Sequence, residues 1–94
     1  MKFTSTRSNV EADSLYTVLR GLAPDGGLYV PAKLPAFDVA ACLADTTMGM
    51  ATRIMSALLP DIPDMPQLVK NAYTGKFETE DLTPTVSVGD FGVL

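Results

Sequence analysis

Residues 21–31, which read GLAPDGGLYVP, constrain the fold of this chain more than any other segment. Gly21 is suited to end a helix. The residues Asp25, Gly26 and Gly27 are suited to a tight turn in which a glycine takes a positive φ and the aspartate bonds a turn amide. A phosphate-binding loop is the alternative, but such loops lead into a helix, whereas this one leads into an apolar run ended by proline. The segment therefore predicts a helix, a structural turn and a short strand.

The spacing of apolar residues predicts the elements around this turn. A strand is expected over residues 2–7, then a helix that Asp13 caps and Gly21 closes with Arg20 in its last turn, and a second strand over residues 28–30. The apolar residues of the helix recur at the spacing typical of a core-facing stripe: Leu15, Val18, Leu19 and Leu22. These elements favour an α/β fold on the border of α+β, with three to four helices packed on a few short strands.

Two further helices are expected in the middle of the chain, over residues 38–44 and 47–59. The second carries an apolar stripe: Met48, Ala51, Met55, Leu58 and Leu59. Such a stripe is typical of a core, and a surface that docks onto a missing domain is the alternative.

The last third of the chain predicts one helix and one hairpin. Asp64 and Gln67 have the spacing of a capping box, and Gly75 supplies the exit of the helix. Its apolar face would consist of Leu68, Val69, Ala72 and Tyr73. Two short apolar runs flank Gly89 and Asp90, which suits a two-residue hairpin turn within residues 85–94.

Composition restricts the class of protein. The chain has 94 residues, of which 47% are hydrophobic, enough for one small domain. Its net charge of −4 argues against nucleic acid and anionic membranes as partners, although one well-placed arginine can still bind an anionic substrate. A mean hydropathy of +0.20 is high for so small a chain and indicates apolar surface that something else covers.

The remaining chemistry-bearing residues exclude several functions. No secretion signal or membrane span is visible, so a cytoplasmic setting is expected, and Cys42 is expected to be a buried structural thiol. The chain has no histidine and no paired cysteines, so neither a metal site nor hydrolytic chemistry is expected. The carboxylates of Glu78, Glu80 and Asp81 are expected to be solvated.

Ser5, Thr6 and Arg7 form the candidate binding site. Hydroxyl groups beside a guanidinium suit a phosphate or a carboxylate, because arginine offers two parallel donors. In the structural alternative, the hydroxyl groups decorate a strand and Arg7 pairs with a nearby carboxylate.

This pattern resembles the amino-terminal domain of threonine synthase. Residues 5–7 are followed in family order by residues 18–31, by Leu34 and Pro35, and by weaker matches up to Thr83 and Pro84. The chain departs from the family at five positions: Ser8 stands for a glycine, Asp13 and Ser14 for a Ser-Phe pair, and Tyr16 and Ala32 for glutamates. These departures point to a divergent member with altered substrate preference.

The resemblance implies that residues 1–94 are one amino-terminal domain, a fragment of a fold-type-II pyridoxal phosphate enzyme without its catalytic domain. The whole enzyme would be a lyase of threonine biosynthesis that converts O-phospho-L-homoserine and water to L-threonine and phosphate. The cofactor lysine would lie beyond Leu94, so no catalytic or cofactor-binding residue is assigned here. The segment would support the active site, and its partner would be the carboxy-terminal catalytic domain of the same chain.

Two alternatives stay open. A threonine-synthase-like phospholyase would eliminate phosphate from another amino-alcohol phosphate. A free-standing module would have lost the catalytic body and would bind a protein partner instead.

Overall fold

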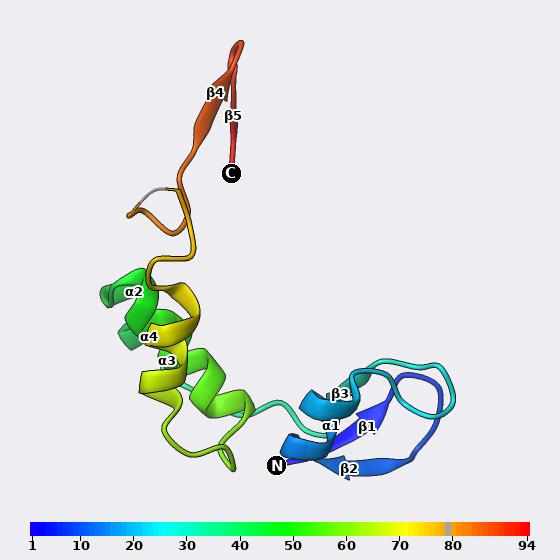
Figure 1. Ribbon diagram of the computed structural model, residues 1–94. Coiled ribbons are helices and arrows are strands. Elements are labelled where there is room, and N and C mark those ends of the chain that lie inside the picture. Colours follow the sequence, from blue (N-terminus) through cyan, green and yellow to red (C-terminus); the bar gives the residue numbers. More distant parts are fainter. Residues whose placement is uncertain (79) are drawn as a thin grey trace.

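The computed structural model describes residues 1–78 and 80–94 (Figure 1). Within them the chain forms four helices and two small antiparallel sheets, which include every predicted helix and strand and make the fold α+β. The elements in chain order are β1 (Lys2–Ser5), β2 (Glu11–Asp13), α1 (Ser14–Arg20), β3 (Tyr29–Pro31), α2 (Val39–Ala44), α3 (Thr47–Leu58), α4 (Met65–Tyr73), β4 (Val86–Val88) and β5 (Phe91–Val93). None of the helices in the described part of the chain is long and apolar enough to span a bilayer.

Residues 1–32 form the sheet lobe, in which β1 lies between β2 and β3. Phe3 is the central residue of this sheet, opposite Ala12 on one side and Pro31 on the other, and it is buried. Strand β2 is short and was not predicted. The ends of α1 are as predicted, because Asp13 Oδ1 accepts the backbone N–H of Tyr16 at 2.9 Å and the closing glycine has φ +80°.

Helix α1 turns its small polar residues inward. Ser14 is 0% exposed and Thr17 7%, whereas the four apolar residues of the predicted core stripe are 54–79% exposed. The implied core packing of Leu15, Val18, Leu19 and Leu22 is therefore wrong. The buried hydroxyls have partners within the fold: Thr17 Oγ1 donates to Ser14 O at 2.8 Å, and Ser14 Oγ to Asp61 Oδ2 at 3.2 Å. Because both hydroxyl groups are hydrogen-bonded, their burial carries little desolvation cost.

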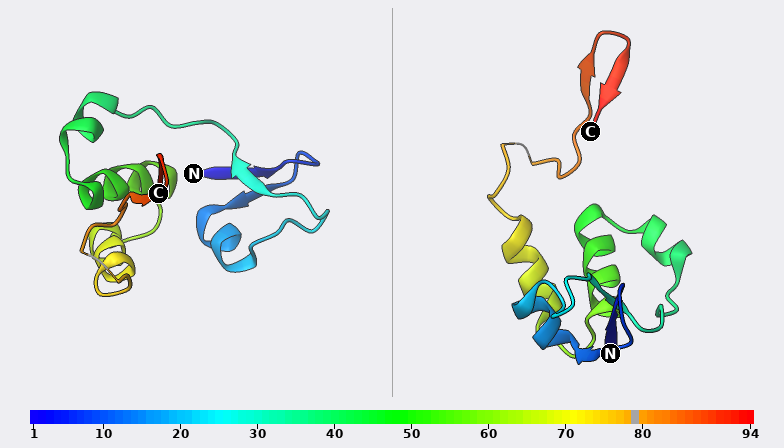
Figure 2. Two further views of the ribbon diagram at one scale, coloured as in Figure 1. Left: turned by 90° about the horizontal axis from the view of Figure 1, so that it is seen from above. Right: turned by 90° about the vertical axis from the view of Figure 1, so that its right-hand side faces the viewer.

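Residues 38–73 form the helix lobe, which lies beside the sheet lobe (Figure 2). Helices α2 and α3 begin at Asp38 and Thr46, whose side chains accept N–H bonds at 3.1 and 3.0 Å. Cys42 is buried, as predicted. The predicted methionine stripe of α3 is only half-buried, and the buried residues of this lobe are Cys42, Met65 and Val69.

The start of α4 departs from the sequence prediction. Asp64 has φ +58° and its carboxylate makes no cap bond. Gln67 Nε2 donates to Asn71 Oδ1 at 2.8 Å instead of reaching back to the cap. The predicted capping box is therefore wrong, because an N-cap side chain reaches the first-turn amides from an extended backbone and not from a left-handed one.

Few contacts join the two lobes. The amino group of Met1 forms an ion pair of 2.6 Å with Asp61 Oδ2, the same oxygen that accepts from Ser14. Val18 of α1 also lines an apolar groove of about 260 Å³ together with residues of α3 and α4, including Met55 and Val69.

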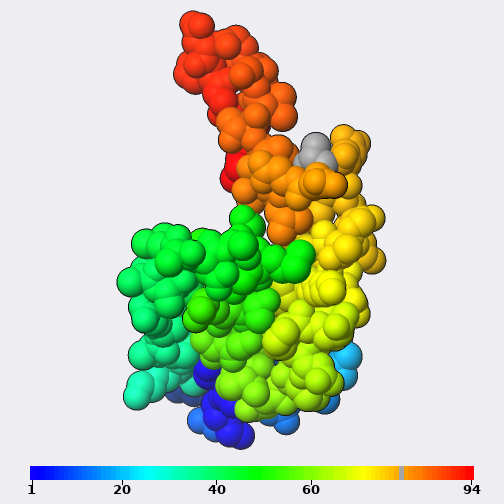
Figure 3. Space-filling view, turned by 90° about the vertical axis from the view of Figure 1, so that its left-hand side faces the viewer, coloured from blue at the N-terminus to red at the C-terminus, as the bar shows by residue number. Residues whose placement is uncertain are grey.

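The β4–β5 hairpin extends away from both lobes (Figures 1 and 3). The predicted hairpin is confirmed, with Gly89 at φ +59° in its turn. The radius of gyration is 16.3 Å, compared with about 12 Å for a compact domain of this length. The extended hairpin contributes to this difference.

Candidate functional site

The structure brings the two predicted clusters of site residues together at one end of the sheet. Asp25, in the loop before β3, accepts hydrogen bonds at Oδ1 from Ser5 Oγ and from the backbone N–H of Gly27, both at 2.8 Å. Its Oδ2 accepts a hydrogen bond from Ser8 Oγ. Asp25 therefore ties the end of β1 to the turn that precedes β3.

The turn itself is closed by backbone bonds. Gly26 takes the positive φ, +78°, and its N–H donates to Ala23 O at 2.9 Å. Thr6 Oγ1 accepts the N–H of Leu28 at 2.9 Å, and the N–H of Thr6 donates to Leu28 O at 2.9 Å. The hydroxyl groups of Ser5 and Thr6 are thus both engaged within the chain.

Arg7 is held differently. Its Nη1 donates to the carbonyl oxygen of Asp25 at 3.3 Å, above Gly26, and its backbone N–H donates to Ser5 Oγ at 3.1 Å. Within the described residues, no carboxylate lies within ion-pair distance of its guanidinium. The exposed guanidinium therefore keeps donors available for an anion from outside the chain.

Three hydrogen bonds hold the pKa of Asp25 below its ordinary value. The largest cause is the Ser8 hydroxyl, followed by the Gly27 amide and the Ser5 hydroxyl. The family that the sequence resembles commonly has a glycine at the position of Ser8. In this chain, the Ser8 hydroxyl therefore adds a hydrogen-bond donor to Asp25. The bond between Ser8 and Asp25 was not predicted from the sequence, because the two residues are 17 positions apart.

This lowered pKa predicts acid sensitivity. A carboxyl group whose pKa is lower in the folded than in the unfolded chain stabilises the fold at any pH above the unfolded-state pKa. This stabilisation is lost as the pH falls through the folded-state pKa. We expect unfolding by urea to become progressively easier as the pH falls below about 4, the ordinary pKa of an aspartate. Asp45 and Asp61 also have lowered pKa values, through Arg53 and the amino terminus, and contribute in the same direction.

Ser8→Ala isolates the contribution of Asp25. It removes the largest cause of the pKa shift and is expected to move the titration of Asp25 upward, toward its ordinary value. Carboxyl chemical shifts followed by NMR during an acid titration measure this directly. The same titration in both proteins would contradict the bond between Ser8 and Asp25.

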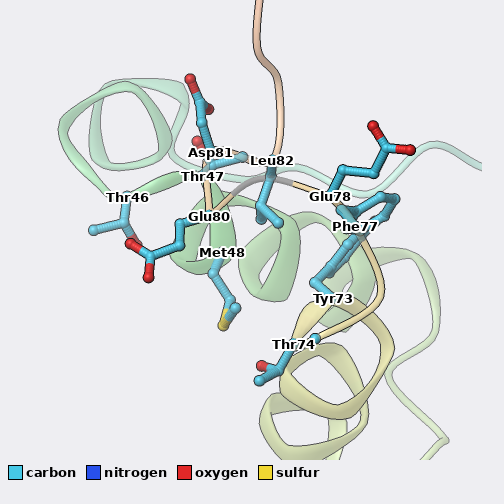
Figure 4. A pocket seen from close by; sticks show the side chains of 11 residues that line it. Thr46, Thr47, Met48, Tyr73, Thr74, Phe77, Glu78, Glu80, Asp81 and Leu82 are labelled. Carbon is cyan, nitrogen blue, oxygen red and sulfur yellow. The ribbon is translucent and has the colours of Figure 1, made fainter.

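A second concave region lies between the start of α3 and the chain after α4 (Figure 4). It has a volume of about 610 Å³, and the rings of Tyr73 and Phe77 stack on its wall with centroids 6.2 Å apart. The carboxylates of Glu78, Glu80 and Asp81 are exposed, as predicted, and Figure 4 shows them spread in different directions. They do not converge on one point, as a pair of acid–base groups would.

Comparison with known proteins decides the family. The family model described as the threonine synthase N terminus matches residues 2–73, from β1 to the end of α4. The chain belongs to the threonine synthase N-terminal domain family. This agrees with the resemblance carried by residues 5–7 and 18–31.

Relatives named threonine synthase match almost the whole chain. The protein from Methylobacillus glycogenes is 38% identical over 104 residues, which cover 96% of this chain and 22% of the relative. That from Corynebacterium glutamicum is 33% identical over 96% of this chain and 21% of its own length. That from Saccharomyces cerevisiae is 31% identical over 89% of this chain and 18% of its own length. The chain thus spans about a fifth of these threonine synthases, and no solved structure matches it significantly.

The lysines of this threonine synthase segment do not fit the pyridoxal phosphate that the family implies. All four are exposed: Lys2, Lys33, Lys70 and Lys76. A lysine that carries this cofactor lies in an enclosed site with donors for the phosphate. Lys2 lines an open cavity of about 350 Å³, but Glu11 and Asp13 share that cavity and would repel a phosphate. Among the residues that the structure describes, none of the lysines therefore lies in a site that fits this cofactor.

Proposed function

We propose that this chain is the amino-terminal domain of a cytoplasmic threonine synthase, the pyridoxal phosphate enzyme that converts O-phospho-L-homoserine and water to L-threonine and phosphate. The observation that carries the proposal is the family match over residues 2–73, together with threonine synthases that align with 96% of the chain. The domain supports the active site of the larger enzyme and has no reacting group of its own. The cofactor and its lysine belong to the catalytic domain of that enzyme.

Within the domain, Arg7 is the residue proposed to contact the substrate. Its exposed guanidinium has no carboxylate partner among the described residues and is aimed by the carbonyl of Asp25. A phosphate or carboxylate group suits its paired donors. Ser5 and Thr6 are positioning residues. Their hydroxyl groups bond the turn that carries the carbonyl group to which the Arg7 guanidinium donates.

A chimera tests the proposed function. In it, this chain replaces the matching amino-terminal region of the Methylobacillus glycogenes enzyme, and L-threonine formed from O-phosphohomoserine is measured. We expect the chimera to form threonine and a variant without the region to form none. A folded chimera that releases phosphate without threonine would contradict the proposed function. Equal activity without the region would favour the free-standing module.

Arg7→Ala in this chimera is expected to raise KM for O-phosphohomoserine, or to lower kcat/KM, by at least about tenfold, near 1.4 kcal/mol. Arg7→Lys should recover part of the loss, because it keeps the charge but not the paired donors. Arg20→Ala serves as the matched control, since Arg20 lies in the last turn of α1. Steady-state kinetics gives both constants, and unchanged values in Arg7→Ala would leave Arg7 with a structural role.

A further inference from the structure

The β4–β5 hairpin has one apolar face and one small polar face. Val86 lies opposite Val93 and Val88 opposite Phe91, so these four side chains share one side of the ribbon. Ser87 and Gly92, which pair with each other, lie on the other side. The apolar four are 50–77% exposed, so they form an unpartnered hydrophobic face. We call it the ribbon face.

Nothing in the described part of the chain covers the ribbon face. Strands β4 and β5 pack on each other and make no substantial contact with either lobe. Figure 1 and the right-hand view of Figure 2 show the hairpin standing clear of both lobes. A two-stranded hairpin alone is at best marginally stable in water and needs a further strand or a packing surface.

The hairpin also lies outside the part of the chain that the family model matches. The family model ends at Tyr73, whereas the Methylobacillus glycogenes relative aligns with 96% of the chain. Homology to threonine synthases therefore continues past the amino-terminal domain as its family defines it. In these relatives, most of the polypeptide lies outside the matched region, because this chain covers 22% or less of their length.

We propose that the ribbon face packs on the catalytic part of threonine synthase, so that the hairpin is the first piece of that part and residues 74–85 form the link between them. The inference rests on the proposed function. Its chemistry is apolar: a hydrophobic surface on the catalytic part would bury the three valines and the phenylalanine. On this proposal, residues 1–94 are not a single domain. Residues 2–73 form the amino-terminal domain, and the β4–β5 hairpin is the first part of the catalytic domain.

A second copy of the chain is a poorer occupant. The ribbon face offers four side chains, whereas a stable interface between separate proteins takes roughly 20–30 residues a side. Two parts of one polypeptide do not lose the translational freedom that separate molecules lose on association, so a small face is sufficient between them. The size of the ribbon face therefore favours an intramolecular partner.

Hydrogen exchange followed by mass spectrometry tests the proposal. The amides of residues 86–93 are compared in the free 94-residue chain and in the chimera with the Methylobacillus glycogenes catalytic part. We expect exchange at least about tenfold slower in the chimera, because packing on a body raises the free energy of local opening. Equally fast exchange in both would overturn the proposal. Slow exchange of these amides in the free chain would also overturn it. If that slow exchange depended on protein concentration, the partner would be a second copy of the chain.

Two neighbouring lysine substitutions separate the faces. In the chimera, Val88→Lys places a charge on the ribbon face and is expected to restore fast exchange over residues 86–93. Ser87→Lys places the same charge on the opposite face and is expected to keep the protection. Loss of protection in both variants, or in neither, would overturn the assignment of the face.

The two proposals fail separately. Threonine formation by the chimera with fast exchange in the hairpin would sink only the ribbon inference. Protection of the hairpin without threonine formation would support packing on the catalytic part and sink the proposed function.

Discussion

Replacing Phe3 by alanine is expected to lower the free energy of unfolding by about 3–5 kcal/mol. Phe3 is 7% exposed and lies on the central strand of the sheet lobe. Truncation removes its apolar surface from the core and leaves a cavity that a three-stranded sheet has little freedom to close. A protein of this size has a total stability of about 5–14 kcal/mol, so the loss is a large part of the whole.

Phe91→Ala is the matched control, because the same side chain is removed from a site that is 77% exposed. In the 94-residue chain its effect should stay within about 0.5 kcal/mol. Urea unfolding followed by circular dichroism measures both variants. Equal losses in the two would show that the core does not lie around β1.

Gly27→Ala is expected to destabilise the chain by about 1–3 kcal/mol through overpacking. A Cβ at this position would lie 2.2 Å from Ser5 Oγ and 2.9 Å from Asp25 Oδ1. Both atoms belong to the hydrogen-bonded cluster around Asp25, so neither can move without loosening the end of β1. The same unfolding experiment gives the magnitude.

A double-mutant cycle tests this steric explanation. Ser5→Ala removes the hydroxyl that the new methyl group would meet most closely. The cost of Gly27→Ala should then fall by at least about 1 kcal/mol in the Ser5→Ala background. An unchanged cost in the two backgrounds would mean that the conflict lies elsewhere than at Ser5.

Local signals explain what could be predicted of the fold. The ends of α1, the start of α2 and the hairpin turn each depend on residues next to them in sequence. Asp13 and Gly21 cap the two ends of α1, Asp38 caps the start of α2, and Gly89 forms part of the hairpin turn. Which face of α1 is buried depends instead on what packs against the helix. Apolar spacing shows which apolar residues share a face of the helix. It does not show that the fold buries Ser14 and Thr17 instead, because the partner of Ser14 is Asp61, which lies far away in sequence.

The candidate site divides in the same way. Residue types indicated that the segments around Arg7 and Asp25 could each bind polar groups. The bonds of Asp25 to Ser5 and Ser8 join positions far apart in the chain, and they arise because β1 pairs with β3. No periodicity within either segment encodes this pairing, so the sequence did not predict it.

The position of β1 has a consequence for how the chain folds. This first strand is the centre of its sheet, and its two neighbours are complete by Pro31. Every strand contact of the sheet lobe therefore lies within the first third of the polypeptide. Synthesis proceeds at about 5–20 residues per second, whereas hairpins close in about 1–10 μs. During synthesis, the sheet can thus form as soon as residues 1–31 have left the ribosome, before the whole helix lobe has emerged, and the helix lobe then packs on a preformed surface.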